Sequence, residues 1–156
     1  MKIFFDMDGT IADFYGVKGW LECLQSENPL PYREAKSRVD EISFSEIINT
    51  LQKMGVKIGI ITWTSKGSST DFHETVIAEK LLWLQRTFPE IAFDEFHAIK
   101  YGTSKEQFCS SDDILFDDEE QNRKDWRKKG HAFTELFIVE TLKEILKILL
   151  DNKEKK

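Results

Sequence analysis

The sequence has little of several residue types, and each shortage excludes a class of protein. Its 156 residues include two cysteines, Cys23 and Cys109, which are too few for a disulfide framework. The three histidines are scattered and lack the spacing of zinc ligands. No apolar run approaches membrane-spanning length, and the apolar run near the N-terminus is too short for a secretory signal. We therefore expect a cytoplasmic protein that does not enter a membrane.

Basic residues are also in the minority. The chain has 22 Lys and Arg against 28 Asp and Glu, which gives a formal net charge of −6. A protein that coats nucleic acid needs a basic face, so we do not expect that class, although a phosphorylated nucleic-acid end is not excluded as a ligand. A small phosphorylated molecule would be attracted only locally, by a metal ion and a few cations. With 40% hydrophobic residues, the chain is long enough and apolar enough to form a core.

Short apolar runs alternate with segments of helical spacing. Four runs are typical of buried strands, at residues 3–6, 56–62, 93–100 and 114–117. Helices are predicted from a capping box at Ser43-x-x-Glu46, over residues 75–88 with Ile77, Leu81 and Leu84 on the buried face, and over 138–150, followed by a frayed tail. This alternation predicts an α/β fold, a Rossmann-like three-layer sandwich with a mainly parallel central sheet and helices on both faces.

One stretch breaks this alternation between the first strand and the helix at Ser43. We expect a single domain over residues 1–156 with a small, cap-like helical insertion at about residues 14–42. Helical spacing is seen at Trp20, Leu21 and Leu24, and residues 32–39 are predicted as a second short helix. The insertion is either a packing element or a flap that covers part of a site, where Tyr15, Trp20 and Tyr32 are candidate substrate contacts.

Residues able to do chemistry follow the predicted strands. The first strand ends in Asp6-Met-Asp8-Gly-Thr10, the second in Thr62, and the last in the pair Asp117-Asp118, while Lys105 follows the third. In a parallel sheet, the carboxyl ends of the strands lie along one edge and form the usual ligand site. We therefore expect these side chains to converge.

In this order, the clusters resemble the four motifs of the haloacid dehalogenase (HAD) superfamily, in its phosphatase branch. Asp6-x-Asp8-x-Thr10 is similar to the first motif, Ile60-Ile-Thr62 to the second, Lys105 to the third and Asp117-Asp118 to the fourth. The second acid, Asp8, is what phosphatases of this superfamily need and dehalogenases do not. The short insertion and Asn122 resemble the small, nearly capless HAD proteins of bacteriophages and prophages, and the paired acids also resemble those of nucleotidases.

The resemblance implies an Mg²⁺-dependent phosphomonoester hydrolase. Asp6 would attack phosphorus to give an aspartyl-phosphate, and Asp8 would act as general acid and then as general base. Mg²⁺ would be held by Asp6, the backbone carbonyl of Asp8, and Asp117 or Asp118. A phosphoryl oxygen would be bound by Thr62 and Lys105, with Trp63 beside it.

Several alternatives remain open at this level. Lys100 and Lys105 both follow the third predicted strand, and Lys105 is preferred because Ser104 and Thr103 can cap a helix that begins with it. The substrate is expected to be a nucleotide or another small phosphorylated metabolite, but the sequence does not name it. The chain could instead be a weakly catalytic regulatory or binding protein on the same scaffold, or a receiver-like phosphoacceptor domain. The oligomeric state is undetermined.

Overall fold

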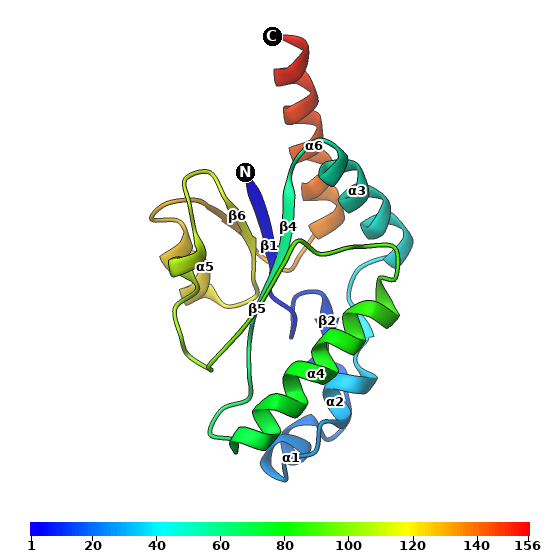
Figure 1. Ribbon diagram of the computed structural model, residues 1–156, viewed down its shortest axis with the longest axis vertical. Helices are drawn as coiled ribbons and strands as arrows, with labels where there is room; N and C mark the ends of the chain where they lie inside the picture. The colour runs from blue at the N-terminus through cyan, green and yellow to red at the C-terminus, as the bar shows by residue number, and fades with distance from the viewer.

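The computed structural model describes residues 1–156 and contains a five-stranded parallel sheet (Figure 1). The strand order is β5-β4-β1-β6-β7. The bounds are β1 (Lys2–Phe5), β4 (Lys57–Trp63), β5 (Glu95–Ile99), β6 (Ile114–Phe116) and β7 (His131–Phe133). The first strand is central, with Phe5 paired to Ile60 of β4 and to Phe116 of β6. All four predicted strands are therefore present, at the sheet positions that bring their carboxyl ends together.

The fifth strand, β7, is not predicted by the apolar pattern. It has three residues, of which only Ala132 is buried, so it offers no apolar run. It forms because its backbone completes the edge of the sheet, where Phe116 pairs with Phe133.

Helices cover both faces of the sheet, which confirms the three-layer arrangement (Figure 1). One face packs against α3 (Glu41–Lys53), α4 (Thr70–Thr87) and α6 (Ile138–Glu154). The other face packs against η2 (Lys105–Phe108) and α5 (Glu120–Trp126). Alternation along β1 divides the two cores, because Ile3 and Phe5 face the first layer and Phe4 faces the second.

The helix boundaries differ in detail from the sequence prediction. Helix α3 begins two residues before Ser43, because the Asp40 carboxylate caps it by accepting a hydrogen bond of 2.9 Å from the Ser43 backbone N–H. Helix α4 begins at Thr70, capped by Ser69. Helix α6 continues to Glu154, so most of the predicted frayed tail is helical.

The buried face of α4 also differs from the prediction. Leu84 is buried as predicted, but Ile77 is only half-buried and Leu81 is exposed. The other buried positions of the helix are Phe72, Val76, Glu79, Lys80 and Trp83. This face is fixed by the elements that contact it. Trp83 donates a hydrogen bond of 2.7 Å to the Ala35 carbonyl, which belongs to the insertion.

The insertion contains η1 (Phe14–Gly16), α1 (Trp20–Gln25), α2 (Leu30–Glu34) and β3 (Lys36–Ser37). The predicted helix over residues 32–39 is wrong beyond Glu34. There the chain becomes extended, and β3 pairs antiparallel with β2 (Ala12–Asp13). Pro31 near the start of α2 shifts the helix towards the N-terminus, as expected from its fixed φ.

Polar contacts hold the insertion against α4. Arg33 forms an ion pair of 2.6 Å with Glu79, and Glu27 accepts hydrogen bonds from the backbone and hydroxyl of Ser69. Beneath these contacts lies a small core of Phe14, Tyr32, Phe72 and Val76. The insertion is therefore a packed element, and Figure 1 shows α1 and α2 beside α4, below the carboxyl ends of the strands.

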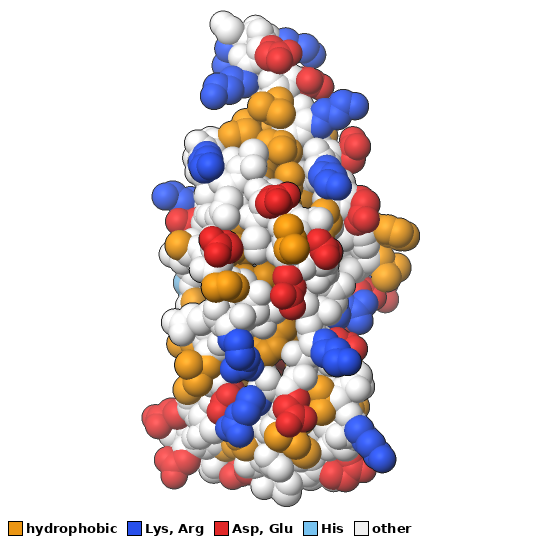
Figure 2. Space-filling view, turned by 90° about the vertical axis from the view of Figure 1, so that its right-hand side faces the viewer, with side chains coloured by type: hydrophobic (Ala, Val, Ile, Leu, Met, Phe, Trp, Pro, Cys, Tyr) orange, Lys and Arg blue, Asp and Glu red, His pale blue; other side chains and the backbone are white.

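The surface over α3, α4 and α6 has acidic and basic side chains interspersed with hydrophobic ones, with no large patch of Lys and Arg on this face (Figure 2). Among the helices, none combines the length and apolar character that crossing a membrane requires.

Candidate active site

The acidic side chains converge where β1 and β6 end. Lys105 joins them, since its ammonium lies 2.8 Å from Oδ1 of Asp6 and 2.7 Å from Oδ2 of Asp117. Only 1% of the Lys105 side chain is exposed. Burial lowers the pKa of Lys105, but the negative charges of Asp6 and Asp117 raise it by more than burial lowers it. The net shift in the pKa is therefore upward. Lys100, the alternative lysine, is exposed and forms no ion pair.

A tight turn after Asp6 brings Thr10 back to the acids. The Thr10 hydroxyl lies 3.1 Å from a carboxylate oxygen of both Asp6 and Asp118, and its single hydrogen can serve one at a time. Gly9 makes the turn possible with a φ of +81°. A methyl group at this position would lie 2.5 Å from Oδ2 of Asp118 and 2.9 Å from the Tyr15 ring.

Three carboxylates form a cluster suited to a divalent cation. Asp6, Asp117 and Asp118 each place an oxygen within 4.8 Å of the others. Burial and the neighbouring Asp6 charge raise the pKa of Asp118 to about 8 and that of Asp117 to about 6. Burial is the larger cause of these shifts and repulsion from Asp6 is the second, and a bound cation would offset that repulsion. Because Mg²⁺ prefers oxygen ligands and keeps several waters, this donor set fits it.

Asp117 is fixed from several directions. Its Oδ1 accepts from the Glu119 backbone N–H at 2.9 Å, and its Oδ2 accepts from the Asn122 amide at 3.1 Å as well as from Lys105. Asn122 is buried against this carboxylate. Asp118 is more exposed than Asp117.

A second buried lysine holds Asp8, and the sequence analysis does not identify it. The Lys80 ammonium, 1% exposed, lies 2.9 Å from Oδ2 of Asp8 and 2.8 Å from the Trp63 carbonyl. Burial raises the pKa of Asp8, and the Lys80 charge partly opposes this shift. The sequence contains one signal for this role, which is the position of Lys80 in the helix. Lys80 has i+4 spacing from Val76 and to Leu84, so it lies on the same buried stripe as these two residues.

Thr62 is also bound to Lys80. Its hydroxyl oxygen accepts a hydrogen bond of 2.6 Å from the Lys80 ammonium, which leaves the hydroxyl hydrogen free to donate. Thr62 and Lys105 are both buried and neither lines the cavity described next, so their contact with a phosphoryl group stays a prediction. Trp63 does line it.

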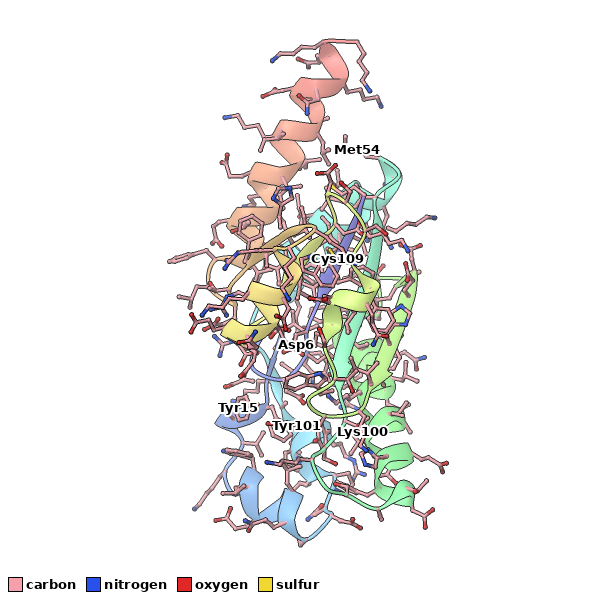
Figure 3. All side chains as sticks on the ribbon, turned by 90° about the vertical axis from the view of Figure 1, so that its left-hand side faces the viewer. Asp6, Tyr15, Met54, Lys100, Tyr101 and Cys109 are labelled. Atoms are coloured by element: carbon pink, nitrogen blue, oxygen red, sulfur yellow. The ribbon has the colours of Figure 1, made fainter.

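A cavity of about 280 Å³ opens above Asp6 and Asp8. Its floor is acidic, with Asp117 and Asp118 beside the first pair. Its walls come from the insertion, from the segment after β4 and from the segment after β5. Figure 3 shows Tyr15 and Tyr101 on the side of Asp6 that faces helix α1. The candidate contacts Tyr15, Trp20 and Tyr32 all line this cavity, which places the insertion both as a packing element and as a wall of the site.

Comparison with known proteins gives matches in structure but not in sequence. No protein-family model matches the sequence, and neither does any curated protein. A D,D-heptose 1,7-bisphosphate phosphatase from Burkholderia thailandensis is similar with a TM-score of 0.52 and 14% identity, over 83% of this chain and 74% of that one. The corresponding phosphatase from B. bronchiseptica, complexed with magnesium and phosphate, gives a TM-score of 0.53 and 11% identity, over 85% and 78%.

A third similar structure matches nearly the whole of both chains. The HAD domain of effector protein Lem4 from Legionella pneumophila has a TM-score of 0.51 and 18% identity, over 94% of this chain and 93% of that one. The chain therefore has the fold of the haloacid dehalogenase (HAD) superfamily, as its four motifs predicted.

Proposed function

We propose that this protein is an Mg²⁺-dependent phosphomonoester hydrolase that works through an aspartyl-phosphate on Asp6. The observation that supports this proposal is that the two acids of the first motif, Asp6 and Asp8, have different partners. Asp6 is paired with Lys105 and Asp8 with Lys80, and both acids line one cavity. Such separate environments allow one carboxylate to be a nucleophile and the other to be a proton donor.

Asp6, Asp117, Asp118 and the backbone carbonyl of Asp8 would hold the cation. When bound, Mg²⁺ supplies positive charge that offsets the repulsion between the phosphoryl oxygens and the attacking carboxylate. Lys105 adds a fixed positive charge beneath the same carboxylates, and it holds Asp6 and Asp117 in place.

The reaction has two steps. In the first, an Asp6 oxygen forms a bond to phosphorus while the bond to the leaving oxygen breaks, and Asp8 gives its proton to that oxygen. In the second, water attacks the phosphorus of the aspartyl-phosphate, Asp8 takes a proton from the water, and Asp6 is released with inorganic phosphate. The raised pKa of Asp8 favours the protonated form that the first step needs.

Lys80 and Thr62 would orient the reacting groups. The Lys80 ammonium lies 2.9 Å from the Asp8 carboxylate and holds it in place. It also donates a hydrogen bond to the hydroxyl oxygen of Thr62. The Thr62 hydrogen is then directed to a phosphoryl oxygen. The insertion at about residues 14–42 would act as a small cap on a single domain, and the substrate would be a nucleotide or another small phosphorylated metabolite of the cytoplasm.

The test is phosphate release by the purified protein, with and without Mg²⁺, across nucleoside monophosphates, sugar phosphates and an aryl phosphate. We expect turnover that requires Mg²⁺ and disappears in Asp6→Asn, whereas Asp151→Asn, which changes an exposed acid in the C-terminal helix, leaves it unchanged. Acid-quenched wild type should contain phosphate that hydroxylamine removes, as expected for an acyl phosphate. A folded protein that binds Mg²⁺ but turns over nothing would favour the regulatory alternative.

A further inference from the structure

Six aromatic side chains line the cavity, and two of them are only partly covered by their neighbours. Tyr15 is 53% exposed and Tyr101 is 48% exposed, and both line the cavity. Each stands against a tryptophan, with ring centroids 5.0 Å apart for Tyr15 and Trp20 and 4.9 Å apart for Trp63 and Tyr101. The cavity therefore offers ring faces and edges immediately beside the acidic floor.

Trp63 and Tyr15 are held in place by further contacts, so these two rings are in position before a ligand binds. The indole N–H of Trp63 donates a hydrogen bond of 2.9 Å to the Thr103 carbonyl. The Tyr15 ring packs against Phe14, which belongs to the small core between the insertion and α4. A rigid aromatic wall binds a flat ring without a large loss of side-chain freedom.

The volume of the cavity limits what can enter it. A cavity of roughly 150 Å³ is sufficient for a benzene molecule. The 280 Å³ available here is therefore suited to a phosphoryl group together with one ring, and it is just below the range of ordinary ligand pockets, which begins at about 300 Å³.

The charges around the cavity favour a single phosphate. Lys66 is the one basic residue among those that line it, and its ammonium lies 5.8 Å from the centre of the Tyr101 ring. The other charged groups there are the acids Asp6, Asp8, Asp117, Asp118 and Glu119. A second phosphate on the substrate would have only Lys66 to pair with, and it would lie among the acids of the cavity. The two heptose bisphosphate phosphatases of similar fold are thus no guide to the substrate.

We propose that the cavity takes a phosphomonoester with a single phosphate whose leaving alcohol has a flat aromatic ring, which packs between Tyr15 and Trp20 on one wall and Trp63 and Tyr101 on the other. This inference rests on the proposed function, and it narrows the substrate class. The ring has two sources, a phenyl group or a nucleobase, and the experiment separates them.

The test compares matched pairs of compounds. Benzyl phosphate and cyclohexylmethyl phosphate have similar size and the same type of leaving alcohol, and they differ in aromatic character. We expect kcat/KM to be about fivefold higher for benzyl phosphate, which is the usual size of an aromatic contact beyond its buried area. Benzyl phosphate and uridine monophosphate, which are both esters of primary alcohols, are each compared with ribose 5-phosphate and then distinguish a phenyl from a nucleobase source. Equal kcat/KM within every pair would overturn the inference.

Variants locate the contact. Tyr101→Leu should remove most of the preference for benzyl phosphate and Tyr101→Phe should keep it. Phe137→Leu, which changes an exposed ring that does not line the cavity, should have no effect. A preference that survives both Tyr101→Leu and Trp63→Leu would contradict the proposed wall.

A binding measurement separates failure of this inference from failure of the proposed function. Calorimetric titration with 2-phenylethylphosphonate and 2-cyclohexylethylphosphonate, in the presence of Mg²⁺, needs no turnover. Tighter binding of the phenyl compound with no hydrolysis of any ester would support the aromatic site and refute the hydrolase. Hydrolysis without any aromatic preference would support the hydrolase and refute the aromatic site.

Discussion

The ammonium of Lys80 lies 2.9 Å from Oδ2 of Asp8 and 2.6 Å from Oγ1 of Thr62, so one buried cation joins the ends of β1 and β4. Only 1% of Lys80 is exposed, and the carboxylate, the hydroxyl and the Trp63 carbonyl are the hydrogen-bond partners of its ammonium. Lys80 is thus placed to control where Asp8 points, and its removal should affect the proton-transfer step selectively.

Lys80→Met is expected to impair the hydrolysis of poor leaving groups most. General acid catalysis contributes about 10²- to 10⁴-fold, and a misplaced Asp8 loses part of it. We expect kcat to fall at least about tenfold for an alkyl phosphate and much less for 4-nitrophenyl phosphate, whose leaving group needs little protonation. The control is Lys143→Met in the exposed part of α6. An equal loss with both substrates would indicate a purely structural role for Lys80.

Lys105→Met should destabilise the protein, and Mg²⁺ should partly restore it. The substitution leaves Asp6 and Asp117 without their shared cation, and loss of one partner of a buried ion pair costs about 3 kcal/mol or more. Urea denaturation with and without Mg²⁺ measures the change in the free energy of unfolding. Lys100→Met, at an exposed position, should change neither stability nor activity. The reverse result would assign the motif lysine to Lys100.

Gly9→Ala is expected to abolish most activity. The alanine would adopt an unfavourable φ, and its methyl group would contact Asp118 and Tyr15 at less than 3 Å. Gly55→Ala is the matched control, because Gly55 has a φ of +92° with no atom within 4 Å of the added carbon. We expect both variants to lower Tm, but only Gly9→Ala to lower kcat. The loss should be about tenfold or more, because a misplaced catalytic group has a cost of this order. Similar kcat values for the two variants would disprove a special role for the Asp118 contact.

The stability of the metal-free protein should fall as the pH rises from about 5 to 8. The pKa of Asp118 is raised to about 8 and that of Asp117 to about 6, against about 3.9 for an aspartate in the unfolded chain. Between these values the folded state retains protons that the unfolded state has lost, so deprotonation favours unfolding. Mg²⁺ should raise Tm more at pH 8 than at pH 5, since it binds the ionised cluster. A Tm that rises with pH in the absence of Mg²⁺ would contradict the acidic cluster described here.

Much of the sheet and of the site could be predicted because the signals are local. A run such as Ile3-Phe4-Phe5 predicts a buried strand without any information from the rest of the chain. An acid directly after it must lie at the edge of the sheet where the strands end. The same reasoning placed Thr62 and the pair at Asp117 and Asp118. The sequence by itself therefore determined the fold class and the acidic part of the site.

Tertiary contacts decided the remainder. Ala132 pairs in β7 because an edge of the sheet was available, and residues after Glu34 become extended because β2 lies beside them. The insertion packs on α4 and so decides which face of this helix is buried. Lys80 lies on that face, and its ammonium therefore reaches Asp8. A lysine on a helix reads as solvated until its surroundings are known. Only the three-dimensional packing supplies the buried carboxylate, hydroxyl and carbonyl that make it a member of the site.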